Sequence, residues 1–584
     1  MTTTIEATIR ACALSELQSR GCVVVRGADR PVVLFYNDGD VRAVDNRCPH
    51  LVFPLHRGSI KDGMITCHWH HAHFDARSGC TFDLWADDVP PYDVEVRDGH
   101  VYVSSHPRRN DPVPHAQRRL RDGMEHNIGL ISAKAILGLR SAKVEAADVV
   151  RTAALYGCEH RDGWAMGLTI LTAMANLLPH LSEQTAFLAL YQGVRRTAAD
   201  CAGQASRRAR PALDTDDLDL DTLERWLRYW TLVRHRDGAE RTLLAAIHNS
   251  DTRVHVPGML FTAATDRFYA DGGHLLDFCN KAYELLELIG HEHAQSVLPA
   301  LTNQLVSARG GEESNAWRHP TDLVPLIQSA AERLPRLFEN ASGAGWDGVI
   351  ELAEAILGDD PAATLSAIEA AIGSGAKPAQ LSKALAYAAA QRVARFGTAN
   401  EISDWVAALH SFSYCNALHQ ALKRWPDPRL VRGVLYGAIS VYLNRFLNVP
   451  PAKLPGERGT LDDMPTDADE LLDLFLAALD SQQQVDRAAG LIARYLSLDH
   501  PPQPLIDTLT RAAVREDADF HTLQMLEAGV AQYHEWGPGE QGTVMLLAVA
   551  RYLAAHSPTQ RAQLQTATIA LRLHRGENIY EDDA

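Results

Sequence analysis

The hydrophobic pattern of the chain changes character once. In its first part, apolar and polar residues alternate in short runs, which is the pattern of half-buried β-strands. These runs lie at residues 22–27, 31–46, 63–67, 71–83 and 92–104. Turns between them carry an Asp-Gly pair at 38–39, 62–63 and 98–99. Asp-Gly favours the tight turns of β-hairpins, so the pattern predicts a small all-β domain at residues 1–105.

Beyond residue 125, apolar residues recur every three to four positions, which is the period of an amphipathic helix. Clear examples are 166–178, 222–233, 323–338 and 470–479. Asp-Pro and Lys-Pro pairs, which are typical of helix starts, occur at 360–361, 377–378 and 427–428. A loop is expected at 449–467. The pattern predicts roughly eighteen helices and a large all-α domain at residues 125–584, either a helical bundle or a repeat-like array.

Two patterns recur inside this helical region. A unit of helix end, acidic turn, helix, short turn and helix begins at Leu155, Ile356 and Tyr495. A second unit begins at Glu240 and again at Glu401. Their alternation suggests two related helical halves. The alternative is an α-solenoid or bundle in which the repeats serve packing only.

Residues 106–124 separate the two regions. They contain three prolines and five arginines and show no hydrophobic period. Such a composition predicts a semi-rigid, exposed basic linker.

Composition narrows the class of protein. The 584 residues are 46% hydrophobic and carry a net charge of −17, and this excess of acid argues against nucleic acid or an anionic membrane as partner. No run of apolar residues is long enough to span a bilayer, and Glu6 and Arg10 interrupt the start where a signal peptide would be apolar. The nine cysteines are scattered and form no CxxC pair. A reducing cytoplasm is therefore the expected location.

Two of the cysteines belong to a pattern that points to chemistry. Cys48 and His50 are followed after sixteen residues by Cys67 and His70. One Cys and one His on each of two loops can hold a [2Fe-2S] cluster, with two thiolates on one iron and two imidazoles on the other. Zinc is the alternative for four such ligands. A zinc finger, however, places its two cysteines together and its two histidines together, so the spacing favours the cluster.

With its strands and this motif, the segment from about residue 5 to 105 resembles a Rieske [2Fe-2S] domain of the ferredoxin and ring-hydroxylating-oxygenase branch. The resemblance implies a cluster held by Cys48, His50, Cys67 and His70 near the surface, and a reductase or ferredoxin as electron donor. In this branch a glycine usually follows the last ligand histidine, whereas His71 follows it here.

The resemblance also implies a function. We expect a Rieske-type oxidoreductase, an oxygenase in which electrons pass from the N-terminal cluster to a site in the helical domain. Its partners would then be O2 and a small organic substrate. The alternative is a non-enzymatic electron-transfer or redox-sensing protein whose helical domain docks a partner.

The helical region offers a hypothesis for that acceptor site, a non-haem iron. Carboxylates and imidazoles contributed twice by facing helices hold such iron in helical proteins, and the second recurring unit supplies both. The candidate Fe(II) ligands are Glu240, His248, His255, Glu401, His410 and His419. The seven-residue spacing in the first copy places its two histidines on one helix face, but the nine-residue spacing in the second places them on opposite faces. The alternative is that these are polar core and helix-capping histidines.

One expected motif is incomplete. Ring-hydroxylating Rieske oxygenases carry an α/β catalytic domain with a D-x2-H-x4-H iron motif. Asp271 and His274 begin such a motif here, but Cys279 stands at the place of its last histidine. The helical character also argues against that domain, so the resemblance does not supply a substrate.

Overall fold

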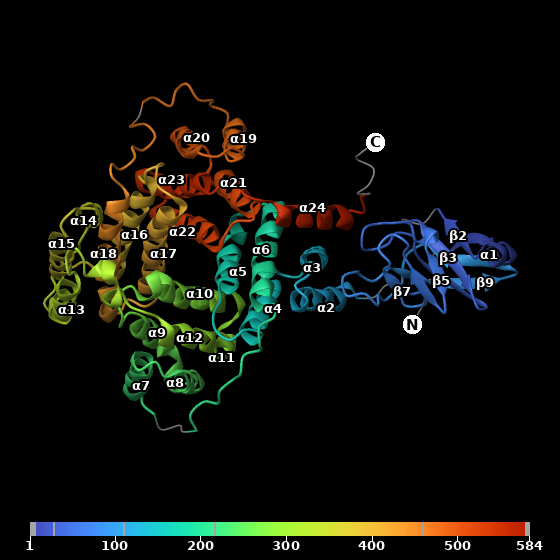
Figure 1. The fold of residues 1–584 in the computed structure, drawn as a ribbon, viewed down its shortest axis with the longest axis horizontal. Helices are drawn as coiled ribbons and strands as arrows, with labels where there is room; N and C mark the ends of the chain where they lie inside the picture. Colours follow the sequence, from blue (N-terminus) through green and yellow to red (C-terminus); the bar gives the residue numbers. More distant parts are fainter. Residues whose placement is uncertain (1–7, 27–29, 109–110, 215–217, 458, 578–584) are drawn as a thin grey trace. The chain divides into compact units, whose positions relative to one another are not determined.

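The chain forms two compact units (Figure 1). Unit 1 comprises residues 1–145 and 565–584, and unit 2 comprises residues 146–564. The computed structural model describes residues 8–26, 30–108, 111–214, 218–457 and 459–577.

Unit 1 begins with antiparallel strands that form three small sheets, in the orders β1-β10-β9, β2-β3-β4-β8 and β5-β6-β7. The strands are β1 (Thr8–Ala13), β2 (Cys22–Val25), β3 (Val32–Asn37), β4 (Asp40–Asp45), β5 (Ser59–Lys61), β6 (Met64–Thr66), β7 (His73–Asp75), β8 (Pro91–Tyr92), β9 (Val94–Arg97) and β10 (His100–Ser104). A short helix, α1 (Leu14–Arg20), follows β1. The predicted small all-β domain is confirmed.

The Asp-Gly pairs act as expected. Asp38 and Gly39, between β3 and β4, have φ angles of 52° and 89°. Both angles lie in the left-handed region that a two-residue type I′ hairpin turn requires. The pairs at 62–63 and 98–99 have positive φ at both positions as well. Local sequence thus sets the pairing of three hairpins.

The core of unit 1 encloses the two motif cysteines. Val44, Ile65 and Phe74 are buried in one cluster together with Cys48 and Cys67. Alternate side chains of a strand face one side of its sheet, so the apolar positions of β4, β6 and β7 gather around the thiols. The sulfur atoms are therefore shielded from solvent.

The predicted linker at 106–124 is corrected by the structure. Helix α2 (Pro112–Glu125) occupies most of it, and α3 (Gly129–Ser141) follows in the same unit. Asp111 caps α2 by accepting from the N–H of Val113. Proline is tolerated in the first turn of a helix, so Pro112 and Pro114 do not prevent helix formation. The boundary between the units lies at 145–146 rather than at 105.

Unit 2 has helices and no strand among its described residues. Its α-helices are α4 (Ala146–Glu159), α5 (Met166–Leu177), α6 (Glu183–Cys201), α7 (Leu220–Leu232), α8 (Arg236–His248), α9 (Val256–Ala264), α10 (His274–Ile289), α11 (Ala294–Val297), α12 (Thr302–Ser307), α13 (Val324–Glu339), α14 (Val349–Ile356), α15 (Pro361–Gly373), α16 (Pro378–Ala394), α17 (Ile402–Arg424), α18 (Arg432–Leu443), α19 (Ala468–Ala478), α20 (Val485–Ser497), α21 (Pro502–Val514), α22 (Phe520–Trp536), α23 (Glu540–Ala555) and the first residues of α24 (Ala562–His574). The predicted all-α region is confirmed.

The predicted helical segments match observed helices. The four example segments correspond to α5, α7, α13 and α19. The three copies of the first recurring unit contain the helix pairs α5–α6, α15–α16 and α21–α22. Asp360 caps α15 ahead of Pro361, as the Asp-Pro pair predicts. That these pairs are true structural repeats stays a prediction.

Four helices from distant parts of unit 2 pack against one another. Helix α10 packs against α17 and α5, and α17 packs against α22.

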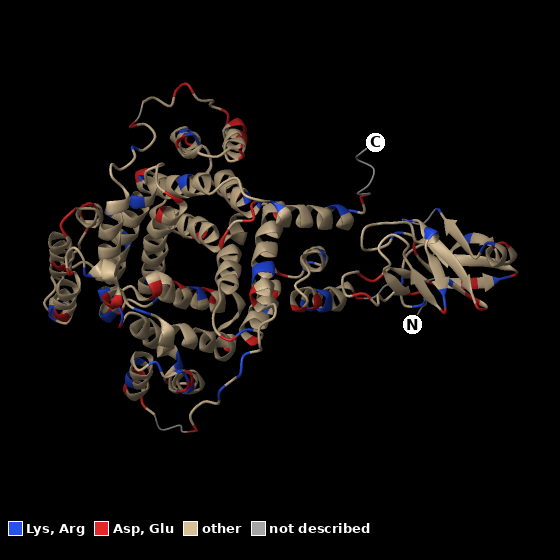
Figure 2. Cartoon of the chain, viewed as in Figure 1, with Lys and Arg blue, Asp and Glu red and all other residues tan. Residues whose placement is uncertain are grey.

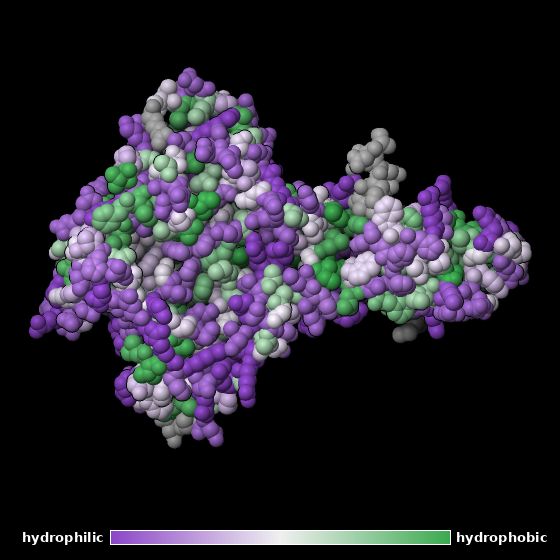
Figure 3. Space-filling model, viewed as in Figure 1, coloured by the Kyte–Doolittle hydropathy of each residue, from purple (hydrophilic) through white to green (hydrophobic). Residues whose placement is uncertain are grey.

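The surface carries charges of both signs. In Figure 2, basic and acidic residues are interspersed over the helices. The face seen in Figure 3 is mainly hydrophilic, with separate hydrophobic patches. Within the described part of the chain, no helix has both the length and the apolar character needed to span a membrane.

Candidate functional site

The four predicted cluster ligands lie on two loops with the same backbone path. In each loop, the N–H of the fourth residue after the cysteine donates to the cysteine carbonyl, Val52 to Cys48 at 2.7 Å and His71 to Cys67 at 2.9 Å. The N–H of each cysteine donates to the carbonyl five residues further on, at 2.8 Å in both loops. Each loop is thereby closed on itself and carries one cysteine and one histidine.

The loops bring like ligands together. The thiol groups of Cys48 and Cys67 are buried and share a hydrogen bond. The rings of His50 and His70 have centroids 4.7 Å apart and meet at 85°. A pair of thiols beside a pair of imidazoles is the arrangement that mixed ligation of a [2Fe-2S] cluster needs.

Backbone donors surround both sulfur atoms. The N–H groups of the second and third residues after each cysteine donate to its sulfur. The hydrogen bond with Cys48 lowers the pKa of Cys67 to about 6. The backbone N–H donors lower it as well, and together these hydrogen bonds outweigh burial, which would raise the pKa. The same thiol–thiol bond raises the pKa of Cys48. Hydrogen bonds to sulfur also help to set a cluster's reduction potential.

His50 has the properties of a metal ligand. Its Nδ1 atom is buried and has no hydrogen-bond partner, which is rare for a buried polar atom. Burial, and then the charges of His70 and Lys134, lower the pKa of His50 to about 4, so that its ring is neutral at pH 7. The residues present therefore fit a [2Fe-2S] cluster held by Cys48, His50, Cys67 and His70.

Helices α2 and α3 brace the first ligand loop within unit 1. Lys134 of α3 donates to the carbonyl of Pro49 at 3.0 Å and pairs with Asp87 at 2.9 Å. Arg119 of α2 lies 3.3 Å from the same carboxylate. Burial alone would raise the pKa of Asp87, but Lys134, His115 and Arg119 together lower it. The cluster loop is thus tied to residues beyond the β-strands.

The loops contain a backbone strain that a substitution can relieve. Val52 and His71 have φ angles of 57° and 61°, a region that suits glycine and is unfavourable above all for a β-branched residue. The left-handed conformation costs roughly 1–2 kcal/mol for a residue other than glycine, against a smaller entropic loss when glycine is introduced. We expect Val52→Gly to raise the free energy of unfolding of unit 1 by about 1 kcal/mol, as measured by urea denaturation.

Val52→Ala is the matched control, because alanine loses the valine side chain but keeps the unfavourable φ. It should stabilise unit 1 less than Val52→Gly does, because it removes only the part of the strain that is due to β-branching. Equal stabilisation by both substitutions would show that side-chain packing, not backbone strain, is responsible.

Among the described residues, neither carboxylate predicted for the second iron site lies in a group of side chains that could share a metal ion. Glu240 on α8 is fully buried and forms ion pairs with Arg207 and, at 3.0 Å, with Arg210. Glu401 is the exposed residue that precedes α17. The charge of Glu240 is therefore balanced by two arginines inside unit 2, and Glu401 is the N-cap residue of α17.

Three of the four predicted histidines lie apart from one another. His248 is the last residue of α8 and contacts Gln295 at 3.3 Å, while His255 is exposed in the turn that follows. His419 is buried beside Gln532. Among the described residues, no three of the six candidates come within ligating distance of a common point. The predicted ligand set is corrected, because α8 ends at His248 and the continuous α17 places His410 and His419 on opposite faces.

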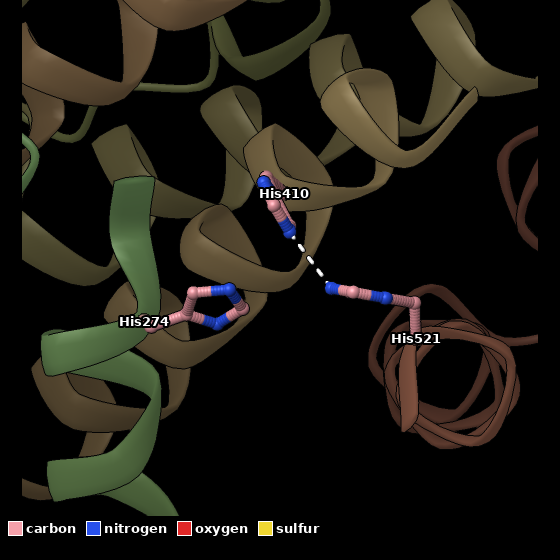
Figure 4. A group of neighbouring side chains, drawn as sticks. All are labelled: His274, His410 and His521. Atoms are coloured by element: carbon pink, nitrogen blue, oxygen red, sulfur yellow. Dashed lines mark hydrogen bonds between the residues drawn. The ribbon is translucent and has the colours of Figure 1, made fainter. Parts of the chain in front are cut away.

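The fourth histidine belongs to a cluster that the sequence did not predict. His410 of α17 meets His274, the first residue of α10, and His521 of α22 (Figure 4). One ring nitrogen from each of the three lies within 4.8 Å of the other two, and the Nε2 atoms of His410 and His521 are 3.0 Å apart. Burial and neighbouring imidazoles lower the pKa of His274 to about 4 and that of His410 to about 3.

Spacing could not reveal this group, since its members stand on three helices more than a hundred residues apart. The nearest signal was Asp271 and His274 at the start of the incomplete D-x2-H-x4-H motif. In the structure Cys279 is buried in the same helix, so the motif itself does not form.

Comparison with known proteins agrees with the ligand loops. Residues 7–91 match the family model of the Rieske [2Fe-2S] domain. The 3-phenylpropionate/cinnamic acid dioxygenase ferredoxin subunit of Photorhabdus laumondii is 34% identical over 95 residues, which cover 16% of this chain and 90% of that protein. Human apoptosis-inducing factor 3 is 28% identical over 100 residues, 17% of this chain and 16% of that protein.

Among solved structures, the ferredoxin of carbazole 1,9a-dioxygenase from Nocardioides aromaticivorans is 25% identical, with a TM-score of 0.16, and the match covers 17% of this chain and 97% of that one. The family match lies wholly within unit 1. Unit 1 therefore has the electron-transfer role of a Rieske domain. Through this N-terminal domain, the chain belongs to the Rieske [2Fe-2S] family.

Proposed function

We propose that the chain is a Rieske-dependent oxidoreductase that takes single electrons from a reductase or ferredoxin and uses them within its own helical unit. In this proposal it acts as an oxygenase on a small organic substrate, and a non-haem iron in unit 2 is the electron acceptor. A [2Fe-2S] cluster supplies one-electron transfer when bound. The observation that carries the proposal is the presence, in one chain, of Rieske ligand loops and a helical unit with a half-buried histidine cluster.

Unit 1 offers a route for electrons to enter. His70, at the tip of the second ligand loop, is exposed, and Trp69 beside it is 50% exposed. Their rings lie 5.6 Å apart. His50, by contrast, packs against Trp85 at 4.8 Å and is half-buried. An exposed ligand edge lets a donor protein approach closely.

Unit 2 offers room for a substrate. A cavity of about 1180 Å³ is lined in part by Trp405, Asp519 and Thr522, which is large enough for a small organic molecule. Asp519 also accepts a hydrogen bond from Nδ1 of His521 at 3.1 Å. The cavity therefore reaches a residue that directly contacts the histidine cluster.

Counting electrons tests the proposal without knowledge of the substrate. The air-oxidised full-length protein is titrated anaerobically with dithionite, and cluster reduction is followed by its visible absorption. A chain with a redox-active acceptor in unit 2 should take up about two electrons per cluster, because a [2Fe-2S] centre accepts one electron.

Uptake of one electron per cluster would contradict the proposal. The chain would then be an electron-transfer or redox-sensing protein, with the helical unit as a docking surface for a partner.

A further inference from the structure

We propose that His274, His410 and His521 form a three-histidine site for a divalent first-row transition metal ion. Each side chain comes from a different helix of unit 2, and the three rings converge on one point (Figure 4). Metal binding at this site does not depend on the proposed function. Only the further step, that the metal is the iron that accepts electrons, rests on it.

The separation of the ring nitrogens suits a metal. The Nε2 atoms of His410 and His521 are 3.0 Å apart. Two nitrogens at about 2.1 Å from one ion, at right angles, would lie roughly that far from each other. His274 stands at 74° to His410 with ring centroids 4.5 Å apart, so its ring edge can supply a third nitrogen. A hydrogen bond between the neutral rings of His410 and His521 would explain the 3.0 Å distance between their Nε2 atoms. It would not explain why the ring of His274 lies beside them.

The backbone that positions His274 is strained. Tyr269 and Asp271 have φ angles of 46° and 54°, and Gly272 and Gly273 also have positive φ. Non-glycine residues in this conformation cost free energy and are concentrated at functional sites. The path is held by the N–H of Asp271, which donates to the carbonyl of Arg309 at 2.8 Å. The structure thus maintains an unfavourable loop that ends at His274.

One further contact links this loop to helix α17. The ring of Tyr269 packs edge-on against Tyr414, one turn after His410 on α17, at 4.9 Å. A Cβ atom at Gly272 would lie 4.0 Å from Nδ1 of His410. The strained loop and α17 are therefore in direct contact beside the histidines.

Asp519 orients the third histidine. Its Oδ2 atom lies 3.1 Å from Nδ1 of His521, and this contact holds the ring with its Nε2 directed at His410. A carboxylate that orients a histidine ligand in this way is typical of metal sites. Asp519 also caps α22, because it accepts from the N–H of Thr522 at 3.0 Å.

Three imidazole ligands restrict which metal ions can bind at this site. Neutral imidazole suits Fe(II), Co(II), Ni(II), Cu(II) and Zn(II), whereas Mg(II) and Ca(II) prefer oxygen ligands. Three protein ligands leave positions open on the ion. With no carboxylate among the three, the bound ion keeps its full positive charge and favours an anionic or readily polarised ligand at the open positions.

Cobalt binding to the full-length protein tests the site. Co(II) is added to chelator-treated protein, and its absorption, recorded as a difference spectrum against the iron–sulfur background, reports imidazole ligation. We expect one Co(II) per chain. His521→Gln and His410→Ala should each lose that band and weaken binding by more than about 100-fold, since removal of an outer carboxylate partner alone costs 10–100-fold.

Asp519→Asn gives a graded control. Asparagine caps a helix as well as aspartate does, so helix α22 should stay intact while Co(II) affinity falls roughly 10–100-fold. His521 is only partly buried, so His521→Gln should keep the circular dichroism and melting temperature of the parent even if His410→Ala does not fold.

His248→Ala and His419→Gln, two histidines outside the cluster, should bind Co(II) like the parent. Unchanged binding after His521→Gln, or no stoichiometric binding by the parent, would overturn the site. Measuring Co(II) in a Cys48→Ser background separates the two proposals, because the histidine site should keep its affinity there although electron uptake by the Rieske domain is lost.

Discussion

Replacing Cys67 by serine is expected to remove the iron–sulfur cluster from the chain. The thiol is fully buried at the meeting point of the two ligand loops and shares a hydrogen bond with Cys48. Serine cannot supply the thiolate that holds iron in a [2Fe-2S] centre. The purified variant should lose its red-brown colour, and its acid-labile sulfide should fall to background.

Cys80→Ser is the matched control, because Cys80 is an exposed cysteine of the same unit. That variant should keep the colour and labile sulfide of the parent. The helical circular dichroism of Cys67→Ser should also match the parent, since unit 2 has a core of its own. A coloured Cys67→Ser protein with full labile sulfide would contradict the assigned ligand set.

Replacing Lys281 by methionine is expected to destabilise unit 2 by about 3–5 kcal/mol, because it leaves the buried carboxylate of Glu527 without its counterion. Lys281 of α10 is 1% exposed. Its Nζ atom lies 2.7 Å from Glu284 and 2.6 Å from Glu527 of α22. Asn176 donates to both carboxylates at 2.9 Å, but an amide cannot balance their charge. Arg424 lies 3.6 Å from Glu284, so Glu527 is the carboxylate that depends on Lys281. Urea denaturation followed by helical circular dichroism measures the effect.

Lys423→Met provides the comparison, since Lys423 on α17 also pairs with a glutamate, Glu535, but is 40% exposed. An exposed pair contributes at most about 1 kcal/mol, so this variant should unfold close to the parent. In Lys281→Met, adding Glu527→Gln should recover part of the stability. A loss of less than 1 kcal/mol in Lys281→Met would show that the carboxylates are satisfied without the lysine.

The Rieske domain could be predicted from the sequence because its determinants are local. Asp-Gly pairs set the hairpins, alternating apolar residues set the strands, and one short motif carries the four ligands. The helices of unit 2 were predictable for the same reason, as period and capping residues act over a few positions. Helix α2 was not predicted, because the prolines of its first turn were interpreted as the composition of a linker. Proline is compatible with the first turn of a helix, where Pro112 lies.

The histidine cluster depends on tertiary packing. His274, His410 and His521 meet only because α10, α17 and α22 converge, and no local spacing encodes that meeting. Recurring Glu and His residues suggested a different set, but Glu240 is neutralised by arginines and His248 lies at a helix end. Only His410 belongs to both the predicted and the observed group.

We propose that two histidines and two cysteines of unit 1 hold a [2Fe-2S] cluster. Pulsed EPR of the reduced, full-length protein labelled with ¹⁵N-histidine tests it most directly, because coupling to nitrogen reports imidazole bound to iron. We expect a reduced-cluster signal coupled to two histidine nitrogens, and we expect His70→Cys to lose one of the two couplings. A signal without nitrogen coupling, or a colourless protein that carries stoichiometric zinc, would contradict it.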